Sequence, residues 1–475
     1  MARRIKRKFR KINIIFFVTV LLSLVFCFYM YRLNVLPLKY LLLIFGITVL
    51  LNAGVFILIN RKKIGFKIGG IVLSVLIVTL FSFGVYYSGR TLSFFNKSFG
   101  KLFNQYEVKY LLIAKNETAN ENVKKIGYYK EQPNIEDVLK KLKKDKVKYE
   151  LVAFDELGTN VNDFMAGSVD AFLIESNLYE FIESSFDNFH KENYKTVKEI
   201  KISVKEEIKT TTDKNQDAFN IYLGGTDFTN VNTDFNMVVT INKKTKKILL
   251  TSIPRDYYIT IPSKGKKDIL SYAGVWGISS SIEAVEDLLD IKMDYYMKLN
   301  TNSLVGLVDE LGGLEYCSDI SYTTTHAQIL DSYDDWTGKK LRVQQGCKTY
   351  NGIQILTIAR ERKAFDDGDN QRQKNCQTII INIFKKMAST NTLSNYNDVL
   401  NAVADLYTTN TPKEVVQDII KRTVDGAKWE FVQQSLEGTG GEGYVHLGTI
   451  KDYVMQPNTM SVNNAKAKIN SIYSK

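Results

Sequence analysis

The sequence contains few of the residues on which most metal centres and covalent active sites depend. Among its 475 residues there are only three histidines and four cysteines. His190, His326 and His446 lie far from one another in the sequence and outside any motif. No Cys-x-x-Cys pair occurs, so the pattern argues against structural zinc and against a histidine-based triad or metal centre.

Basic charge, by contrast, is plentiful, and much of it lies beside apolar runs. The net charge is +12, and hydrophobic residues make up 45% of the chain. A basic protein could bind nucleic acid, but here much of the excess flanks hydrophobic segments instead of covering a recognition helix. The pattern therefore indicates a membrane protein without a nucleic-acid partner, and the chain is long enough for more than one packed domain.

Three apolar runs occupy the first hundred residues. Residues 12–31, 40–60 and 68–88 each provide about 20 residues, the length that an α-helix needs to cross a bilayer. A basic tail, residues 1–11, precedes the first run, and a basic cluster at residues 61–67 follows the second. We therefore expect a multi-pass protein of the bacterial cell membrane, with a cytoplasmic N-terminus and an extracellular part after residue 88. A cleaved signal peptide is the alternative for the first run, but its apolar core is too long and no small-residue cleavage site follows.

The cysteines fit this topology. Cys27 lies inside the first run, whereas Cys317, Cys347 and Cys376 fall in the part expected to be exported, where a disulfide could persist. Cys317 and Cys347 could pair across neighbouring segments. Two unpaired buried thiols are an equal alternative, because spacing alone does not establish the geometry.

A small α/β module is expected at residues 107–207. Hydrophobic periodicity predicts strands at residues 108–114, 149–154 and 171–174 and a helix at residues 135–142. The order of strand, helix and strand is similar to one half of a solute-binding protein, but no group of polar residues marks a binding site. We interpret the module as a spacer or docking module, followed by a polar linker at residues 205–216.

A larger α/β domain is expected at residues 219–475. We predict strands at residues 220–223, 237–242 and 248–252, with a basic hairpin turn at residues 243–247, and helices at residues 282–289, 303–311 and 372–387. Strands alternating with helices imply a sheet covered on both faces.

Charged residues of this domain follow the ends of predicted strands. Pro254 interrupts a strand and presents Arg255 at its end. Two acids and several arginines form a set that would suit a polyphosphate, because carboxylates hold a hard divalent cation and planar guanidiniums bind phosphate oxygens bidentately. The set consists of Asp227, Asp234, Arg255, Arg360, Arg362 and Arg372. In an extended segment, Arg360 and Arg362 would share one face.

Each of these residues also has an ordinary structural interpretation. An aspartate after a strand often caps a turn, and arginines before a helix often make surface ion pairs of little energetic value. Asp366, Asp367 and Asp369 could suggest calcium, but no glutamate stands at EF-hand spacing, so we interpret them as a solvated loop.

Taken in order, the motifs resemble those of a known family. The blocks are GGTD, TDFNMVVTINKKTKKILLTSIPRDYYITIP, LVDELGG and NGIQILTIARERKAFDDGDNQRQ. They resemble the LytR-CpsA-Psr family of bacterial cell-envelope phosphotransferases over about residues 219–387. The three apolar runs and the small module resemble the capsule-associated branch of that family, and the C-terminal residues 412–475, which we expect to be helical, continue the similarity without motifs.

The resemblance implies a fold and a reaction. It implies an α/β/α domain with a central mixed sheet, which transfers a glycopolymer from an undecaprenyl pyrophosphate carrier to peptidoglycan and leaves a phosphodiester link. In this comparison Asp227 and Asp234 would hold Mg²⁺, or Mn²⁺ in its place, and the pyrophosphate would be bound by Arg255, Arg360, Arg362 and Arg372. Asp234 is our choice for the base that acts on the acceptor hydroxyl, and Arg255 would act directly on the reacting phosphate.

The family's apolar slot for the polyprenyl tail would be lined here by helices such as residues 282–289 and 379–384. On pattern alone, the same apolar stripes are ordinary core.

Four positions depart from the family pattern. Asn232 stands where an arginine is usual, with Thr233 for a serine, and Ile269 stands for a lysine that Lys266 or Lys267 could replace. Asn370 replaces another arginine, and Cys376 replaces a glutamine. Each change removes a phosphate or sugar contact, and a charge-assisted contact contributes roughly 1.5 to 3 kcal/mol. An active transferase remains our main hypothesis. The alternatives are a non-catalytic protein that binds or regulates lipid-linked glycopolymers and a pyrophosphatase that acts on the same lipids.

Overall fold

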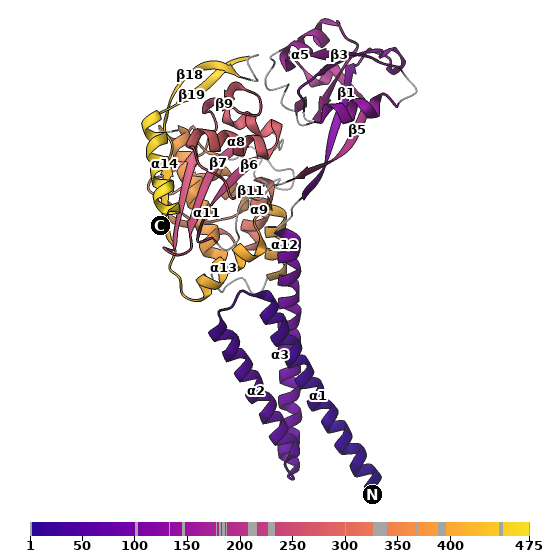
Figure 1. Cartoon of the computed structure of the whole chain (residues 1–475), viewed down its shortest axis with the longest axis vertical. Helices are drawn as coiled ribbons and strands as arrows, with labels where there is room; N and C mark the ends of the chain where they lie inside the picture. Colours follow the sequence, from indigo (N-terminus) through magenta and orange to yellow (C-terminus); the bar gives the residue numbers. More distant parts are fainter. Residues whose placement is uncertain are drawn as a thin grey trace. The chain divides into compact units, whose positions relative to one another are not determined.

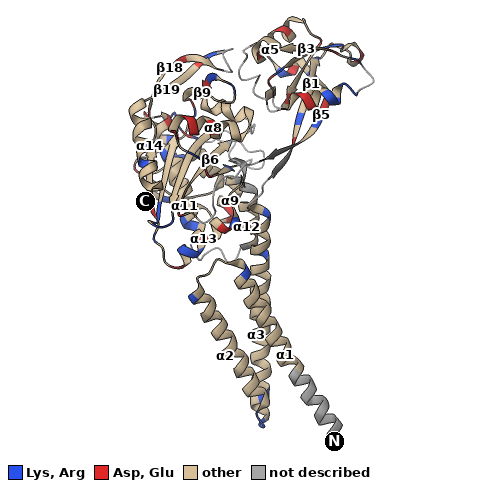
Figure 2. Cartoon of the chain, viewed as in Figure 1, with Lys and Arg blue, Asp and Glu red and all other residues tan. Residues whose placement is uncertain are grey.

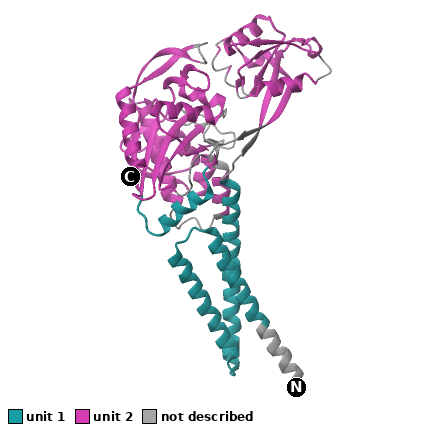
Figure 3. Ribbon diagram, viewed as in Figure 1, with its two compact units in different colours: residues 1–100, 411–429 teal, residues 101–410, 430–475 magenta. Residues whose placement is uncertain are grey.

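The computed structural model describes most of the chain, and contact density divides it into two compact units (Figures 1 and 3). The described residues are 2–99, 103–132, 134–144, 148–176, 178–179, 182, 186, 188–207, 216–226, 233–299, 301–325, 340–366, 368–387, 396–445 and 450–474. The first unit comprises residues 1–100 and 411–429, and the second comprises residues 101–410 and 430–475.

Three long apolar helices form most of the first unit. They are α1 (Ala2–Leu33), α2 (Leu38–Asn60) and α3 (Ile64–Ser98), and all three are long and apolar enough to cross a membrane. In α2 and α3, lysines and arginines gather toward the ends (Figure 2). The three helices predicted from the apolar runs are therefore confirmed, each somewhat longer than its run.

Close contacts hold these helices to one another. Phe26 of α1 stacks on Phe81 of α3 with ring centroids 4.9 Å apart. This approach needs Gly84, because a Cβ at that position would lie 2.4 Å from the ring of Phe26. Asn52 of α2 donates to the hydroxyl of Ser23 in α1, which satisfies polar groups that an apolar surrounding would leave without partners.

Helix α13 (Lys413–Val424) belongs to the same unit. The buried Gln417 donates to the carbonyl of Leu33 at the end of α1, and Lys413 donates to Asn96 near the end of α3. Lys39 and Asp425 form a further ion pair at 2.6 Å. Residues 411–429 thus pack with the apolar helices, although sequence analysis assigned them to the larger domain.

The small module is built on a five-stranded sheet with strand order β3-β2-β4-β1-β5. Its strands are β1 (Phe103–Lys115), β2 (Lys125–Tyr129), β3 (Glu150–Phe154), β4 (Ala171–Glu175) and β5 (Tyr194–Glu207), and its helices are α4 (Ile135–Leu142) and α5 (Leu157–Ala166). β2 pairs in parallel with β3 and β4, while β1 pairs antiparallel with β4 and β5. The predicted helix at 135–142 has the observed bounds, but β2, β5 and α5 were not predicted.

The larger domain has a six-stranded mixed sheet with strand order β16-β11-β6-β7-β8-β17. Its strands are β6 (Ala218–Thr226), β7 (Thr233–Asn242), β8 (Lys247–Ile253), β11 (Tyr295–Leu299), β16 (Tyr407–Thr409) and β17 (Glu430–Ser435). β6, β7 and β8 form an antiparallel meander, and β11 and β17 add to it in parallel. The α/β class and the mixed sheet are therefore as predicted.

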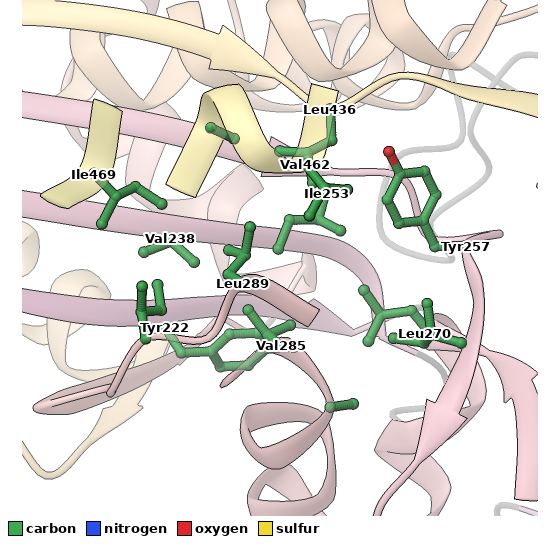
Figure 4. Packing of buried hydrophobic residues seen from close by; sticks show 14 of the residues in the cluster. Tyr222, Val238, Ile253, Tyr257, Leu270, Val285, Leu289, Leu436, Val462 and Ile469 are labelled. Atoms are coloured by element: carbon green, nitrogen blue, oxygen red, sulfur yellow. The ribbon is translucent and has the colours of Figure 1, made fainter. Parts of the chain in front are cut away.

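Helices pack against both faces of this sheet. The helices of the domain include α8 (Ile278–Leu289), α9 (Thr301–Glu310), α10 (Gly352–Arg360), α11 (Gly368–Met387), α12 (Tyr396–Leu406) and α14 (Thr459–Tyr473). On one face α8 and α14 enclose a core around Tyr222, Val238 and Leu289 (Figure 4). On the other face Gln377 of α11 donates to the hydroxyl of Ser252 in β8.

The C-terminal region differs from the expectation that residues 412–475 are helical. Between α13 and α14 lie β17 and a hairpin of β18 (Gly438–Val445) and β19 (Ile450–Pro457). The error has a physical cause, because β17 pairs with β8 across a large sequence separation and the glycine-rich β18 carries no hydrophobic alternation.

A disulfide joins Cys317 and Cys347, which resolves the question that spacing left open. The two residues face each other in register on β12 (Leu314–Ser318) and β15 (Gly346–Tyr350).

Candidate functional site

The backbone around Arg255 is fixed from three sides. β8 ends at Ile253, and the amide of Tyr257 then donates to the carbonyl of Pro254 in a tight turn. The carbonyl of Arg255 accepts from the amide of Ser271, and the carbonyl of Asp256 accepts from the amide of Met455 in β19 at 2.7 Å. The turn therefore presents the two charged side chains in a defined direction, as the proline in the sequence predicted.

Arg255 forms ion pairs with two aspartates. Its Nη1 lies 2.6 Å from Oδ1 of Asp234, and its Nε lies 3.3 Å from Oδ1 of Asp256. The strand register explains the first pair. Asn236 of β7 stands opposite Ile253 of β8, so continuing the antiparallel register by two residues brings Asp234 opposite Arg255. Burial works against the charged guanidinium, but Asp234 and then Asp256 outweigh it and raise the pKa of Arg255. The guanidinium is therefore held charged in a partly buried place.

The beginning of α11 adds a second ion pair to this place. Arg372 Nη2 lies 2.5 Å from Oδ1 of Asp369, and both side chains are about nine-tenths buried. Gln373 donates to the other oxygen of Asp369. The prediction that Asp369 belongs to a solvated loop is therefore wrong, because the residue lies in the first turn of a helix, three residues before a cation.

The electrostatics of Asp256 show that these groups act on one another. Burial raises the pKa of the Asp256 carboxyl; Arg255 opposes this shift, and Asp369 adds to it. Arg372 and Arg362 lower the pKa of Asp256 as well. Three guanidiniums and three carboxylates thus share one site. We call this set, Asp234, Arg255, Asp256, Arg362, Asp369 and Arg372, the charged cluster.

The segment around Arg360 and Arg362 is held by the buried carboxylate between them. Glu361 accepts from the amide of Thr325 at 2.6 Å, from its hydroxyl at 3.0 Å, and from the amide of Ala364 at 3.0 Å. Arg360 is the last residue of α10, so the two arginines do not lie on one extended segment as assumed. Glu361 was not named from sequence, although an acid between two arginines was a visible signal.

Two predicted site positions lie outside the described residues, namely Asp227 and Asn232. Two of the other family departures have clear surroundings. Ile269 is buried with Val445 and Val454, so that position belongs to an apolar cluster, and Lys267 lies over the ring of Tyr258 with its Nζ 5.8 Å from the centroid. The thiol of Cys376 is near the carbonyl of Ala359, and burial raises its pKa to about 12, so it stays protonated.

The helices named for a polyprenyl slot contribute to the core. Val285 and Leu289 of α8 are fully buried in the cluster shown in Figure 4, and Ile379 of α11 is buried in a second cluster with Tyr316 and Ile358. These side chains have the ordinary core role, and the slot stays a prediction.

The chemistry of the charged cluster suits Mg²⁺ bound together with phosphate. In the part of the chain that the structure describes, no group of three histidine, cysteine, aspartate or glutamate side chains forms a metal cage. Mg²⁺ at phosphate-transfer sites uses one or two carboxylates and completes its shell with phosphate oxygens and water. Asp234, which is partly exposed beside Arg255, could serve as a ligand of this kind.

Comparisons with known proteins match this region. A family model described as the LytR_cpsA_psr family matches residues 181–474. The chain is 32% identical over 211 residues to a polyisoprenyl-teichoic acid–peptidoglycan teichoic acid transferase TagU of Enterococcus faecalis, covering 44% of this chain and 64% of that relative. It is also 32% identical over 186 residues to biofilm regulatory protein A of Streptococcus mutans, covering 38% of this chain and 44% of that relative.

Solved structures show a similar partial match. The crystal structure of B. subtilis TagU is 26% identical and aligns with 55% of this chain and 98% of its own, with a TM-score of 0.42. A structure of TagT bound to LIIa-WTA is 24% identical over 56% of this chain, with a TM-score of 0.43. The chain thus spans less than two thirds of the length of the two curated relatives named above.

Proposed function

Because the chain belongs to the LytR-CpsA-Psr family, we propose that it is a membrane-anchored phosphotransferase of the cell envelope. In this proposal it transfers a glycopolymer from an undecaprenyl pyrophosphate carrier to a hydroxyl of peptidoglycan, in capsule or other wall-polymer assembly. The observation that carries the proposal is the ion pair of Arg255 and Asp234 inside the charged cluster. The TagU relatives, which are named as polyisoprenyl-teichoic acid–peptidoglycan teichoic acid transferases, support the same class of reaction.

The arginines of the cluster suit a pyrophosphate. The charges of the three guanidiniums and three carboxylates balance, and each of the two closest ion pairs joins an arginine to an aspartate. A bound pyrophosphate would replace these aspartates as the partner of Arg255 and Arg372. The planar guanidinium groups bind phosphate oxygens bidentately. Arg362, and Arg360 at the end of α10, would bind the remaining oxygens. Catalysis at such sites rests on positioning and charge neutralisation.

Release of Asp234 from Arg255 gives the carboxylate a second role. We assign it as the base that takes the proton of the acceptor hydroxyl. The acceptor oxygen then forms a bond to the phosphorus that bears the glycopolymer, and the bond from that phosphorus to the bridging oxygen breaks. Polyprenyl monophosphate leaves with that oxygen, and the product is a phosphodiester.

A divalent cation completes the balance of charge. With the cluster neutral, a pyrophosphate brings an excess of negative charge, and Asp234, with Asp227, would hold Mg²⁺ or Mn²⁺ beside it. When bound, the cation would neutralise charge on the phosphate oxygens.

The three apolar helices serve this function by keeping the enzyme in the membrane that contains its lipid-linked donor. We propose that the N-terminus is cytoplasmic and that the catalytic domain is extracellular, where peptidoglycan lies. The basic residues 61–63 between α2 and α3, with Lys67 in the first turn of α3, support this orientation.

The test uses the intact protein in lipid nanodiscs with Mg²⁺, a polyprenyl pyrophosphate-linked oligosaccharide and peptidoglycan fragments. Mass spectrometry should detect a phosphodiester-linked product, and Asp234→Ala should abolish it. Tight binding of the lipid without product, unchanged in Asp234→Ala, would instead identify a binding protein. That alternative has one structural observation in its favour, because the usual lysine position is the buried Ile269. Release of polyprenyl monophosphate without any ligated product would identify a pyrophosphatase.

A further inference from the structure

The hairpin of β18 and β19 is attached to the turn that carries Arg255. Besides the bond from the amide of Met455 to the carbonyl of Asp256, Met455 forms a β-bridge with Tyr257. The hydroxyl of Tyr257 donates to the carbonyl of Glu437 just before β18. The hydroxyl of Tyr258 donates to the carbonyl of Tyr444 at 3.0 Å. Three consecutive residues after Arg255 thus hold the hairpin beside the charged cluster.

Tyr453 on this hairpin has one supported and one accessible side. An added Cβ at Gly440 of β18 would lie 2.9 Å from the Tyr453 hydroxyl and 3.0 Å from its Cε2, so the ring lies over a residue without a side chain. The side chain of Tyr453 is nevertheless 51% exposed. A large ring that is held in place by the backbone and open to solvent is the arrangement of a stacking platform.

The ring also lies within electrostatic reach of the charged cluster. Partial burial raises the pKa of the Tyr453 phenol, Asp256 and Asp369 raise it further, and Arg362 lowers it. Tyr453, two residues before the Met455 that bonds to Asp256, is thus at the edge of the site that would bind the pyrophosphate.

We propose that Tyr453 forms a carbohydrate subsite next to the charged cluster, where its exposed face stacks on a pyranose ring. The face of an aromatic ring carries negative partial charge and attracts the weakly positive C–H groups that line one face of a pyranose. The inference rests on the proposed function, because that reaction brings two sugars to the phosphates: the first sugar of the donor and the sugar of the peptidoglycan acceptor.

Four variants of the intact protein in nanodiscs test the subsite. Tyr453→Ala removes the ring, and Tyr453→Phe keeps it. Gly440→Ala places a methyl group against the ring and should displace it. Tyr444→Ala is the matched control, because Tyr444 is a tyrosine on the same hairpin with a similar exposure of 58%. Thermal melting of each variant checks that the fold is retained.

Three readouts separate the two sources of sugar. They are the affinity for polyprenyl pyrophosphate without sugar, the affinity for a polyprenyl pyrophosphate-linked oligosaccharide, and the KM for peptidoglycan fragments. A donor-sugar subsite predicts that Tyr453→Ala and Gly440→Ala weaken binding of the oligosaccharide lipid roughly two- to tenfold, while binding of the sugar-free lipid is unchanged. An acceptor subsite predicts that the same two variants raise the KM for peptidoglycan fragments by a similar factor and leave both lipid affinities unchanged. In both cases Tyr453→Phe should behave like the wild type.

The inference is overturned if Tyr453→Ala matches Tyr444→Ala in every readout. It is also overturned if Tyr453→Ala weakens binding of the sugar-free lipid as much as binding of the oligosaccharide lipid. This result is distinct from failure of the proposed function. If the wild type does not bind the sugar-free lipid and forms no product, the transferase proposal fails, whatever Tyr453 does.

Discussion

Arg255 and Asp234 are joined by a 2.6 Å ion pair, and the register of β7 and β8 places the two residues opposite each other. The last residue pair between these antiparallel strands is Asn236 and Ile253. Asp234 lies two residues before that pair in β7, and Arg255 lies two residues after it, where β8 has ended. Both side chains are about one quarter exposed. The pair is therefore available to a ligand while its geometry is set by the sheet.

Replacement of Arg255 should be the most damaging single change among the arginines. The family arginine and lysine positions occupied by Asn370 and Ile269 offer no cation, so Arg255 carries a larger share of phosphate binding. We expect Arg255→Ala to lower kcat/KM about 10²- to 10³-fold, the loss typical for removal of a charge-stabilising group at a reaction centre. Transfer of oligosaccharide to peptidoglycan fragments measures it.

Arg342→Ala is the matched control for that experiment. Arg342 is exposed on β14 (Arg342–Val343) and donates to the hydroxyl of Thr323. Its removal should leave the rate unchanged. If Arg255→Ala keeps activity within about threefold of the wild type, a difference of less than 1 kcal/mol, Arg255 has no direct part in the reaction.

The metal requirement should depend on Asp234. Removal of divalent cations with EDTA should abolish transfer, and Mg²⁺ or Mn²⁺ should restore it. In Asp234→Asn, which keeps the size but not the charge, the Mg²⁺ concentration for half-maximal binding of the lipid donor should rise at least tenfold, because one anionic ligand has been lost. Asp290→Asn should not alter the titration, because Asp290 is an exposed residue whose ion-pair partner is Lys466 and not a residue of the charged cluster. Transfer that survives EDTA would contradict a metal-dependent site.

Glu361 should position the arginine segment without contacting the substrate. Its carboxylate accepts three hydrogen bonds from Thr325 and Ala364, which ties the loop after α10 in place. Glu361→Ala should raise the KM for the lipid donor more than it lowers kcat, whereas Glu361→Gln, which keeps one acceptor oxygen, should recover part of the loss. A fall in kcat with KM unchanged in both variants would indicate a direct catalytic role.

Sequence reasoning found the parts of the site that local patterns encode. The alternation of residues 237–242 and 248–252 around a basic turn predicted the β7–β8 hairpin, and the break at Pro254 predicted the exposure of Arg255. The pair of Asp369 and Arg372 could also have been found, since residues three apart on a helix are neighbours. The pattern of acids in that segment was instead interpreted as a loop.

The missing parts depend on contacts between distant segments. The attachment of Met455 to Asp256 joins residues almost two hundred positions apart, and no periodicity in the sequence specifies it. The same holds for the parallel pairing of β17 with β8. Gly440 of β18, in a region expected to be helical, leaves the space that the ring of Tyr453 fills. The disulfide required the register of β12 and β15, which spacing does not give.

The stability of the protein should respond to pH through Asp256. Burial raises the pKa of this carboxyl, so the folded state favours its protonated form. The resulting stabilisation is fully present below the ordinary carboxyl pKa and is lost as the pH rises through the raised folded value. Asp256→Asn removes this dependence. Its melting temperature should match the wild type in acid and should be equal or higher, by on the order of a few degrees, at neutral pH.

Asp290 supplies a control of opposite sign for the pH experiment. Its ion pair with Lys466 lowers the pKa of Asp290, so that stabilisation is present at neutral pH and is lost as the pH falls. Asp290→Asn should therefore melt below the wild type at neutral pH and approach it in acid. If Asp256→Asn shows this second pattern, the ion pair with Arg255 outweighs burial at Asp256.

The disulfide should stabilise the hairpin of β12 and β15 and should be the redox-sensitive element of the fold. Cys317 and Cys347 are separated by 30 positions, and closing a loop of that length removes entropy from the unfolded chain worth about 3 to 4 kcal/mol. Reduction, or the double change Cys317→Ser and Cys347→Ser, should lower the melting temperature by several degrees. In Cys376→Ser, reduction should still lower the melting temperature as it does in the wild type. The Cys376 thiol, whose pKa burial raises to about 12, is not part of the bond.

Thiol labelling distinguishes the disulfide from its alternative. Both Cys317 and Cys347 are exposed, so after reduction of the native protein they should react with maleimide, whereas the half-buried Cys376, whose thiol pKa burial raises, should react more slowly until the domain unfolds. Before reduction neither of the pair should react. Labelling of Cys317 and Cys347 in the untreated protein would show that the thiols are free. Packing of the buried Tyr316 and Tyr350 would then have to hold β12 and β15 together without a disulfide.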